Sequence, residues 1–348
     1  MRVWQAFLKT DIGTVGIDIG SRSVKAVEAS RRAGRLWIGR YGAASLPPDA
    51  IVDGEVMDRE VVIECIQDLL RESGIRSRHV ASAVSGRSVI VKRITLDSMT
   101  TEEAGEVIYW EAEQHITYGI DEVSLDYQIL GESGQGKMDV LLVAAKKETV
   151  EMHMSLLRDA GLVPMIVDVD SLAVQNAFEA NYEVDKDEKV LLMNVGASVT
   201  NVSLLAGGAP LFTRDLSIAG NAFVEEIQRV LSVDREEAER IARDPIEEER
   251  ERIAPILETV GQDLLLGVER SLSYLRGVAG SAEISRALLS GGGALLPGLH
   301  AFVANRLGVP VEIADPFRSL DYDGDLFGEG EREGIGPSLM VAVGLALR

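Results

Sequence analysis

The sequence predicts an α/β protein built of two lobes. Val15–Val27 and Val190–Leu204 share one pattern, in which two apolar runs flank a tight turn of small residues. This pattern is typical of a β-hairpin with an exposed polar tip. Strand-like and helix-like segments alternate along the rest of the chain. With 348 residues, 46% of them hydrophobic, the chain can bury substantial cores, which favours two lobes over one.

The first lobe is expected to continue with a strand, a helix and a second strand. The strand covers residues 36–46 and stops at Pro47, the helix covers residues 58–74, and the second strand is His79–Val84. Cys65 lies within the helical pattern and is interpreted as a core residue. A single cysteine also excludes an intramolecular disulfide.

Val89–Leu162 interrupts this alternation and reads as a compact α/β insert. After an initial strand, its elements are expected at Thr101–His115 (helix), Val123–Leu130 and Met138–Ala145 (strands), and Lys147–Ala160 (helix). The second lobe is expected to begin near Val190. It contains an acidic helical stretch, Asp234–Glu251, and then an amphipathic helix to about Arg276, whose charges are interpreted as solvated faces.

The two hairpins align residue by residue, with Asp18 on Asn194 and Gly20 on Gly196. A carboxylate or amide at the end of each first strand, followed by small residues with accessible backbone N–H groups, would give two anion-binding turns and an anchor for a divalent metal. A third element, Ala287–Leu299, ends an apolar run in three glycines, where a flat ring or a phosphate can approach the backbone. Together these elements predict a clamp for a nucleoside triphosphate.

Other patterns exclude competing sites. Gly131–Lys137 matches G-x-x-x-x-G-K, but Met138 replaces the required Ser or Thr and a strand follows, so a flexible hairpin loop is expected. Four scattered histidines and one cysteine do not suggest a zinc site. A formal net charge of −21 disfavours nucleic acid and anionic lipid. No apolar run is long enough to span a membrane, and Met1–Thr10 is too polar for a signal peptide.

The order of the two turns and the glycine motif resembles the actin-like (ribonuclease H-like) ATPase superfamily. The chain is most similar to PilM-type type IV pilus assembly proteins, which are related to FtsA-type cell-division proteins, and the resemblance covers nearly the whole chain. It also rests on Trp110–Leu130, Val167–Phe178 and Arg214–Gly220. It implies an actin-like fold with an FtsA-like 1C insert, divided into a first lobe (1–88), the insert (89–162), a connecting helix of the first lobe (163–189), a second lobe (190–333) and a C-terminal helix returning to the first lobe (334–348).

The resemblance also implies site residues for ATP and Mg²⁺. Asp18 and Asn194 match the metal-binding positions. The cofactor-binding residues are Gly20, Ser21, Arg22, Ser23, Lys25, Gly196, Ala197, Ser198, Gly220, Glu225 or Glu226, Gly291, Gly292 and Gly293. Asp170 matches the catalytic acid that orients the attacking water.

Simpler structural roles remain open for three of these positions. Lys25 could be a solvent-facing strand residue, Asp170 a helix cap, and the glutamates of the 225–226 pair a charged helix face. Asn194 stands where the superfamily usually has aspartate. Because an amide brings no negative charge, metal affinity should be lower and ATP hydrolysis at most slow.

The implied function is an ATP-binding scaffold of the pilus inner-membrane assembly complex. The implied partner is the cytoplasmic N-terminal tail of a PilN-like membrane protein, bound in a groove formed by Val89–Leu162 and the adjoining first lobe. The chain would then be cytoplasmic and attached to the inner membrane through this partner, without inserting into it. A filament-forming ATPase and a small-molecule kinase of the same fold are the alternatives.

Overall fold

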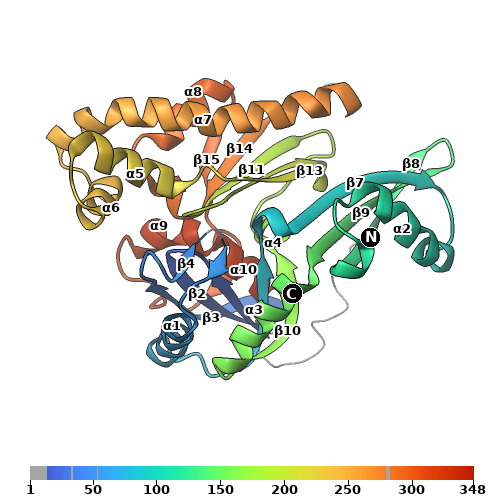
Figure 1. The fold of residues 1–348 in the computed structure, drawn as a ribbon, viewed down its shortest axis with the longest axis horizontal. Helices are drawn as coiled ribbons and strands as arrows, with labels where there is room; N and C mark the ends of the chain where they lie inside the picture. The colour runs from blue at the N-terminus through green and yellow to red at the C-terminus, as the bar shows by residue number, and fades with distance from the viewer. Residues whose placement is uncertain (1–13, 33, 53, 280–282) are drawn as a thin grey trace.

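The computed structural model describes residues 14–32, 34–52, 54–279 and 283–348 (Figure 1). The Met1–Thr10 segment lies outside the described residues. In the described ranges, no helix combines the length and the hydrophobicity that crossing a bilayer requires.

A six-stranded sheet forms the first lobe, in the order β10-β6-β1-β2-β3-β16. Its strands are β1 (Thr14–Ile19), β2 (Ser23–Arg32), β3 (Arg35–Ser45), β6 (His79–Val84), β10 (Val163–Val169) and β16 (Asp321–Tyr322). The predicted hairpin, strand and helix of this lobe are confirmed. Its helices are α1 (Arg59–Glu72), α3 (Lys147–Asp159), α4 (Asp170–Asn181) and α10 (Met340–Ala346); β4 (Ile51–Val52) and β5 (Glu55–Val56) form a small extra hairpin.

Helices cover both faces of this sheet because its strands carry apolar residues on both sides. One face packs against α1 and α3 in a cluster that includes Ile17, Ile66 and Leu157, with Cys65 at its margin. The other face packs against α4 and α10. Helices α4 and α10 also pack closely against each other, since a Cβ at Gly344 of α10 would lie 1.7 Å from the carbonyl oxygen of Ala173 in α4. The C-terminal helix therefore returns to the first lobe, and only glycine fits at this crossing.

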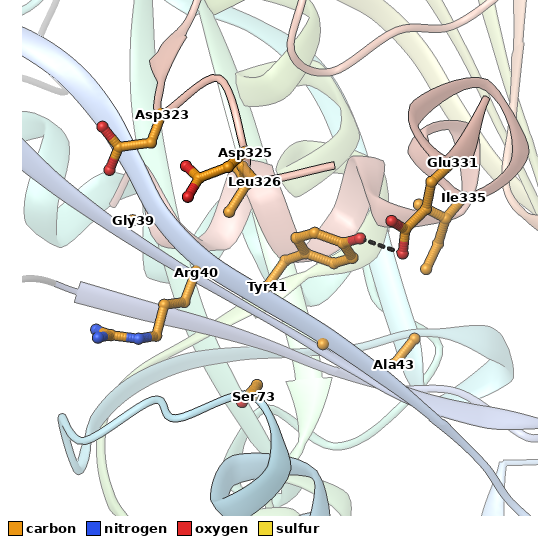
Figure 2. A pocket seen from close by; sticks show the side chains of 11 residues that line it. Gly39, Arg40, Tyr41, Ala43, Ser73, Asp323, Asp325, Leu326, Glu331 and Ile335 are labelled. Atoms are coloured by element: carbon orange, nitrogen blue, oxygen red, sulfur yellow. Dashed lines mark hydrogen bonds between the residues drawn. The ribbon is translucent and has the colours of Figure 1, made fainter. Parts of the chain in front are cut away.

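At the edge of this sheet, β16 covers only part of β3. It pairs with Trp37 and Ile38. The chain then turns away, with the N–H of Leu326 bonded to the carbonyl of Asp323 at 3.0 Å. The second half of β3 therefore lies beside open space (Figure 2).

A five-stranded sheet forms the second lobe, in the order β13-β12-β11-β14-β15. Its strands are β11 (Lys189–Val195), β12 (Thr200–Ala206), β13 (Ala209–Leu216), β14 (Arg286–Ser290) and β15 (Val311–Ile313), and its helices are α5 (Gly220–Leu231), α6 (Arg235–Arg243), α7 (Glu247–Ala279) and α8 (Leu299–Leu307). The predicted acidic stretch is not one helix: α6 ends at Arg243 and α7 begins at Glu247. Asp244 precedes Pro245 and leaves the helical conformation (φ −143°, ψ 73°), because a following proline disfavours that conformation.

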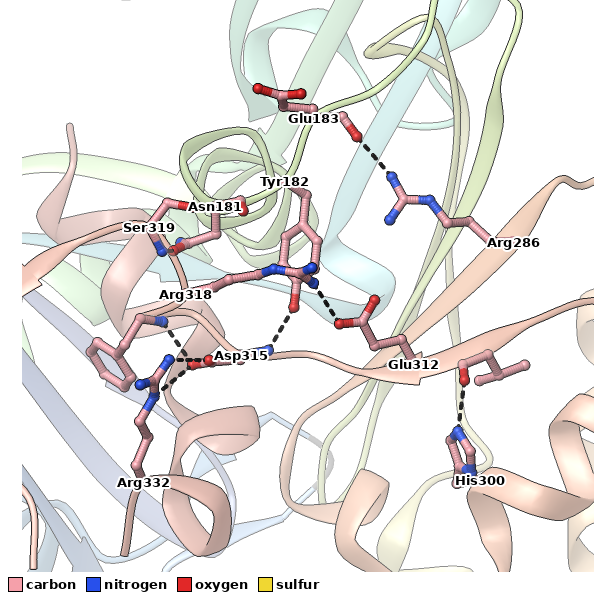
Figure 3. Close-up of polar contacts among 12 residues, drawn as sticks. Asn181, Tyr182, Glu183, Arg286, His300, Glu312, Asp315, Arg318, Ser319 and Arg332 are labelled. Carbon is pink, nitrogen blue, oxygen red and sulfur yellow. Dashed lines mark hydrogen bonds and ion pairs between the residues drawn. The ribbon is translucent and has the colours of Figure 1, made fainter.

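The two lobes share one apolar cluster. The face of the second sheet that carries Val190 and Leu192 packs in the same cluster as Phe178 of α4 and Leu345 of α10. Past β15, the chain returns to the end of α4, where the Asp315 N–H donates to the Tyr182 hydroxyl at 2.8 Å (Figure 3). This return leads to β16 and to α9 (Glu331–Ile335).

The insert is a three-stranded sheet, β7-β9-β8, with one helix across it. Its elements are β7 (Val89–Asp97), α2 (Thr101–His115), β8 (Val123–Gly134) and β9 (Lys137–Lys146). The Gly131–Lys137 motif forms the tip of the β8–β9 hairpin, without a following helix, as expected.

The placement of α3 changes the expected insert boundary. The predicted insert runs to Leu162, but Leu156 and Leu157 of α3 are buried in the first-lobe core. We therefore propose that the insert ends at Lys146 and that α3 belongs to the first lobe.

Candidate functional site

The two hairpins close with the same hydrogen bond. The Gly20 N–H donates to the Ser23 carbonyl at 3.0 Å, and the Gly196 N–H donates to the Val199 carbonyl at 3.0 Å. Because these two N–H groups close their own turns, an anion between the hairpins would meet the residues further round each tip, Ser21 and Arg22 on one side and Ala197 and Ser198 on the other. The two hairpins, which align in sequence, therefore also share the backbone hydrogen bond that closes their turns.

Lys25 points back to Asp18 across the first hairpin. The Lys25 Nζ lies 3.0 Å from Asp18 Oδ2, and the two side chains are only 13% and 12% exposed. The interpretation of Lys25 as a solvent-facing residue is therefore wrong. Its ammonium supplies, beside Asp18, the positive charge that a bound Mg²⁺ would also bring.

His153 of α3 lies beneath this end of β1, which the sequence did not indicate. The Ser82 hydroxyl donates to the Ile17 carbonyl at 2.7 Å, so its oxygen accepts the Nε2–H of His153 at 2.8 Å. Burial lowers the pKa of His153 to about 4, so the ring is neutral at pH 7. An isolated histidine on a helix gives no spacing signal, and only the packing of α3 brings it close to Asp18.

Asp170 is the first residue of α4 and not its cap. The N-cap position belongs to Val169, so the capping interpretation is wrong. Burial and then the negative charge of Asp18 raise the pKa of Asp170 to about 7, although a hydrogen bond with the Ser85 side chain opposes this shift. A carboxyl group with this pKa can exchange a proton near neutral pH, as a residue that handles a water molecule must.

Asn194 is held by a buried polar network. Its Oδ1 accepts from the Ser290 hydroxyl at 3.1 Å, and its Nδ2 donates to Asn201 Oδ1 at 2.9 Å. Asn201 in turn donates to Asp215 Oδ1 at 2.8 Å, and the backbone N–H of Gly86 donates to Asp215 Oδ2 at 2.6 Å. Gly86 belongs to the link between β6 and β7, so this network joins the second lobe to the first.

Asp215 is a residue that sequence reasoning missed. It lies within Arg214–Gly220, a stretch noted only for its resemblance to the family. Burial raises the pKa of Asp215, and the negative charge of Asp215 helps to raise the pKa of Asp170.

A second polar chain joins the tips of the two hairpins. The Ser198 hydroxyl accepts from Asn221 at 3.1 Å, and Arg235 donates to Asn221 Oδ1 at 2.7 Å. Arg235 also donates to Glu239 Oε1 at 2.9 Å, and Arg22 of the other hairpin binds the same carboxylate at 2.6 Å. We call these five residues the interlobe relay.

The three glycines of the shelf have different roles. A Cβ at Gly291 would lie 2.3 Å from the Val195 carbonyl oxygen, and a Cβ at Gly293 would lie 2.3 Å from Val195 Cγ1. Both glycines are therefore needed for packing against the second hairpin. A Cβ at Gly292 would meet nothing within 4 Å, so this position faces open space.

Of the cofactor-binding residues predicted on α5, Gly220 lies against the second hairpin. The N–H of Gly220 donates to the Gly196 carbonyl at 2.9 Å, which puts the start of α5 against the second turn. Glu226 pairs with Arg229 at 2.5 Å as part of a charged helix face, and Glu225 is exposed. Binding of a ribose by Glu225 stays a proposal.

The donor set determines what could hold a metal. No group of three or more His, Cys, Asp or Glu side chains with a metal-binding arrangement occurs in the described ranges. Mg²⁺ is commonly bound through one or two carboxylates, water molecules and substrate phosphates. Of the two predicted metal positions, Asp18 carries a carboxylate, which is paired with Lys25, and Asn194 carries a neutral amide.

The family model described as type IV pilus assembly protein PilM matches residues 16–348. The chain belongs to this PilM family. A solved PilM–PilN type IV pilus biogenesis complex contains a chain 32% identical to this PilM-family member, with a TM-score of 0.85 over 97% of this chain and 99% of the other.

Relatives outside the family are more distant. FtsA of Pseudomonas aeruginosa is 24% identical over 257 residues, which is 65% of this chain and 59% of FtsA. The ethanolamine utilization protein EutJ of Carboxydothermus hydrogenoformans (16% identity, TM-score 0.60, 96% and 89% covered) and ADP-bound MreB5 of Spiroplasma citri (12%, 0.56, 95% and 94%) share the fold. The actin-like ATPase fold expected for this PilM-family chain is therefore confirmed.

Proposed function

We propose that this PilM-family chain is an ATP-binding scaffold of type IV pilus assembly that docks the cytoplasmic tail of a PilN-like membrane protein. The observation that carries the nucleotide part is the pair of identically closed hairpins, whose tips are joined by the interlobe relay. The observation that supports the partner is the similarity to a PilM chain solved with PilN.

ATP would sit with its phosphates between the two hairpin tips and its adenosine against Gly292. When bound, ATP with Mg²⁺ would bring negative phosphate charge to the space between the lobes. Asp18 would bind the metal, directly or through water, and Lys25 would leave Asp18 for a phosphate oxygen. Asp170 would orient a water molecule, but the neutral amide of Asn194 would keep hydrolysis slow.

The tail would bind where the insert meets the first lobe. On α2 of the insert, Trp110 is 74% exposed and Tyr109 is 54% exposed. On the edge strand β10, Met165 is 64% exposed and is the extra residue of a bulge between Pro164 and Ile166. Exposed aromatic and methionine side chains are enriched in protein interfaces, which makes Trp110 and Met165 candidate contacts for the tail.

A partner of this kind would place the chain at the cytoplasmic face of the inner membrane. The net charge of −21 is unsuited to anionic lipid, so attachment would depend on the partner. Nucleotide would act by changing how the lobes close, because a ligand that binds one closure state better shifts the population toward it.

The partner site is tested with a synthetic peptide from the N-terminus of a PilN-like protein, titrated against the full chain. Trp110→Ala and Met165→Glu should each weaken binding by at least ~10-fold. Met57→Glu is the matched control, because Met57 is also 64% exposed but lies in a loop of the first lobe away from the insert. Wild-type affinity in both site variants would place the tail elsewhere.

A deletion gives a second test. Val89 pairs with Ala145 across the β7–β9 ladder, so the ends of the insert lie side by side and a short linker can replace residues 89–146. This deletion keeps α3, which the first-lobe core requires. It should abolish peptide binding while ATP binding remains.

A further inference from the structure

The second half of β3 is an open sheet edge. β16 pairs with Trp37 and Ile38 only, and in the described part of the chain no other strand pairs with β3 on that side. Backbone N–H and C=O groups of an unpaired edge can bind an added strand. This edge lies at the end of the six-stranded sheet opposite β10 and the insert.

A cavity of about 620 Å³ runs along this open edge. Gly39–Ala43 form its inner side, Ser73 at the end of α1 closes it below, and residues from Asp323 to Ile335 form the opposite wall (Figure 2). The space therefore has the outline of a groove that leads along the strand.

Specific contacts hold the walls of the groove in place. Tyr41 stacks on Phe327 with ring centroids 4.8 Å apart, and its hydroxyl donates to Glu331 at 2.5 Å. Below the strand, a Cβ at Gly42 would lie 2.8 Å from Leu69 and 2.9 Å from Ser73, so α1 packs directly against the backbone. The groove is thus preformed, which lowers the entropy cost of binding.

The rim of the groove is acidic. Asp323, Asp325 and Glu331 are exposed on one side. Arg40 also lines the groove, and its guanidinium pairs with Glu28 at 3.2 Å. A second copy of this chain would bring the same acidic rim and would be repelled, whereas a basic segment would be attracted. Leu326 and Ile335 add an apolar strip to the same wall.

We propose that the groove binds an extended peptide of a partner protein that carries basic and apolar residues, and that this peptide adds a strand to β3. Its backbone would pair with Gly39–Ala43. Side chains on one face of the added strand would point toward this wall, where basic ones would meet Asp323 and Asp325 and apolar ones would lie against Leu326 and Ile335. Strand addition of this kind gets affinity from backbone hydrogen bonds and selectivity from alternate side chains.

The probe for this proposal is a fluorescein-labelled octapeptide of alternating lysine and valine, measured by fluorescence polarisation with the full chain. Two further peptides carry N-methyl groups on either the odd or the even residues, which removes the backbone donors on one edge only. Strand addition requires that one N-methylated peptide loses binding and the other keeps it. Equal binding of all three peptides, or no binding by any, would overturn the proposal.

Charge reversal locates the site. Asp323→Lys with Asp325→Lys should weaken binding of the probe by at least ~10-fold. Asp185→Lys with Asp187→Lys is the matched control, because it reverses two exposed aspartates at the same spacing in another loop. An equal loss in both double variants would show that only the overall charge attracts the peptide, and would overturn the proposal.

Hydrogen exchange measured by mass spectrometry adds a readout that does not depend on charge. The probe should slow exchange in residues 39–45, and Trp110→Ala should leave this protection unchanged, since the insert is at the other end of the sheet. Protection confined to residues 89–146 would instead assign the peptide to the insert and would overturn the proposal.

Discussion

The residues of the candidate site differ in how firmly their neighbours hold them. Asn194 has its amide nitrogen and its oxygen engaged by Asn201 and Ser290, so it is held rigidly in the second lobe. Asp18 is paired with Lys25, and we expect this pair to exchange partners if phosphate and metal bind there. Gly292 alone among the three shelf glycines has free space at its Cα.

Gly292→Leu should weaken ATP binding by at least ~10-fold, about 1.4 kcal/mol, because the side chain would fill the adenosine space. The melting temperature should stay near that of the wild type, since nothing lies within 4 Å of the added Cβ. Isothermal titration calorimetry and thermal melts measure both quantities. Gly334→Leu, at another position with open space, is the control. Unchanged ATP affinity in Gly292→Leu would remove the shelf from the site.

Asp170→Asn should stabilise the metal-free protein at pH 8. The folded-state pKa of Asp170 is raised from 3.8 to about 7, so the folded protein binds the proton more tightly than the unfolded chain. Its contribution to stability is therefore present below pH 4 and is lost as the pH rises toward 7. Melting temperatures of wild type and variant should diverge across this window. A variant less stable than wild type at pH 8 would contradict the raised pKa of Asp170. In the same variant, any ATP turnover should disappear while ATP binding persists.

At the level of elements, the interlobe relay sets the relation between the two hairpins. Arg22 and Glu239 come from opposite lobes, and their side chains are 24% and 25% exposed. An ion pair at this exposure contributes at most about 1 kcal/mol, so it can hold the lobes together without ATP and yet yield to a triphosphate. A weak link is what a ligand-driven closure requires.

Glu239→Gln should loosen the lobes of the nucleotide-free protein, because the relay loses the charge that holds Arg22 and Arg235. The radius of gyration from small-angle X-ray scattering should increase, and saturating ATP with Mg²⁺ should restore the wild-type value. Glu237→Gln is the matched control, since Glu237 pairs with Arg240 within α6 and does not cross between lobes. An identical radius in all three nucleotide-free proteins would show that the relay does not set closure.

For the whole molecule, the sequence predicted local elements well and predicted few of the contacts between residues far apart in the chain. The hairpins, α2 and the β8–β9 tip follow from apolar periodicity and turn residues, which act over a few positions. The Arg22–Glu239 pair joins residues 217 positions apart, and His153 reaches Ser82 only because α3 folds onto the first lobe. The helical pattern of α3 predicted its secondary structure, but it could not show which lobe would cover its apolar face.

We propose that nucleotide between the lobes controls docking of the PilN-like tail. The most direct measurement is the affinity of the tail peptide for the full chain, with and without saturating ATP and Mg²⁺, by isothermal titration calorimetry. We expect the two dissociation constants to differ by at least ~5-fold, a coupling of about 1 kcal/mol, typical of linked sites. A peptide that binds with the same affinity in both conditions, to protein shown to hold ATP, would contradict the account.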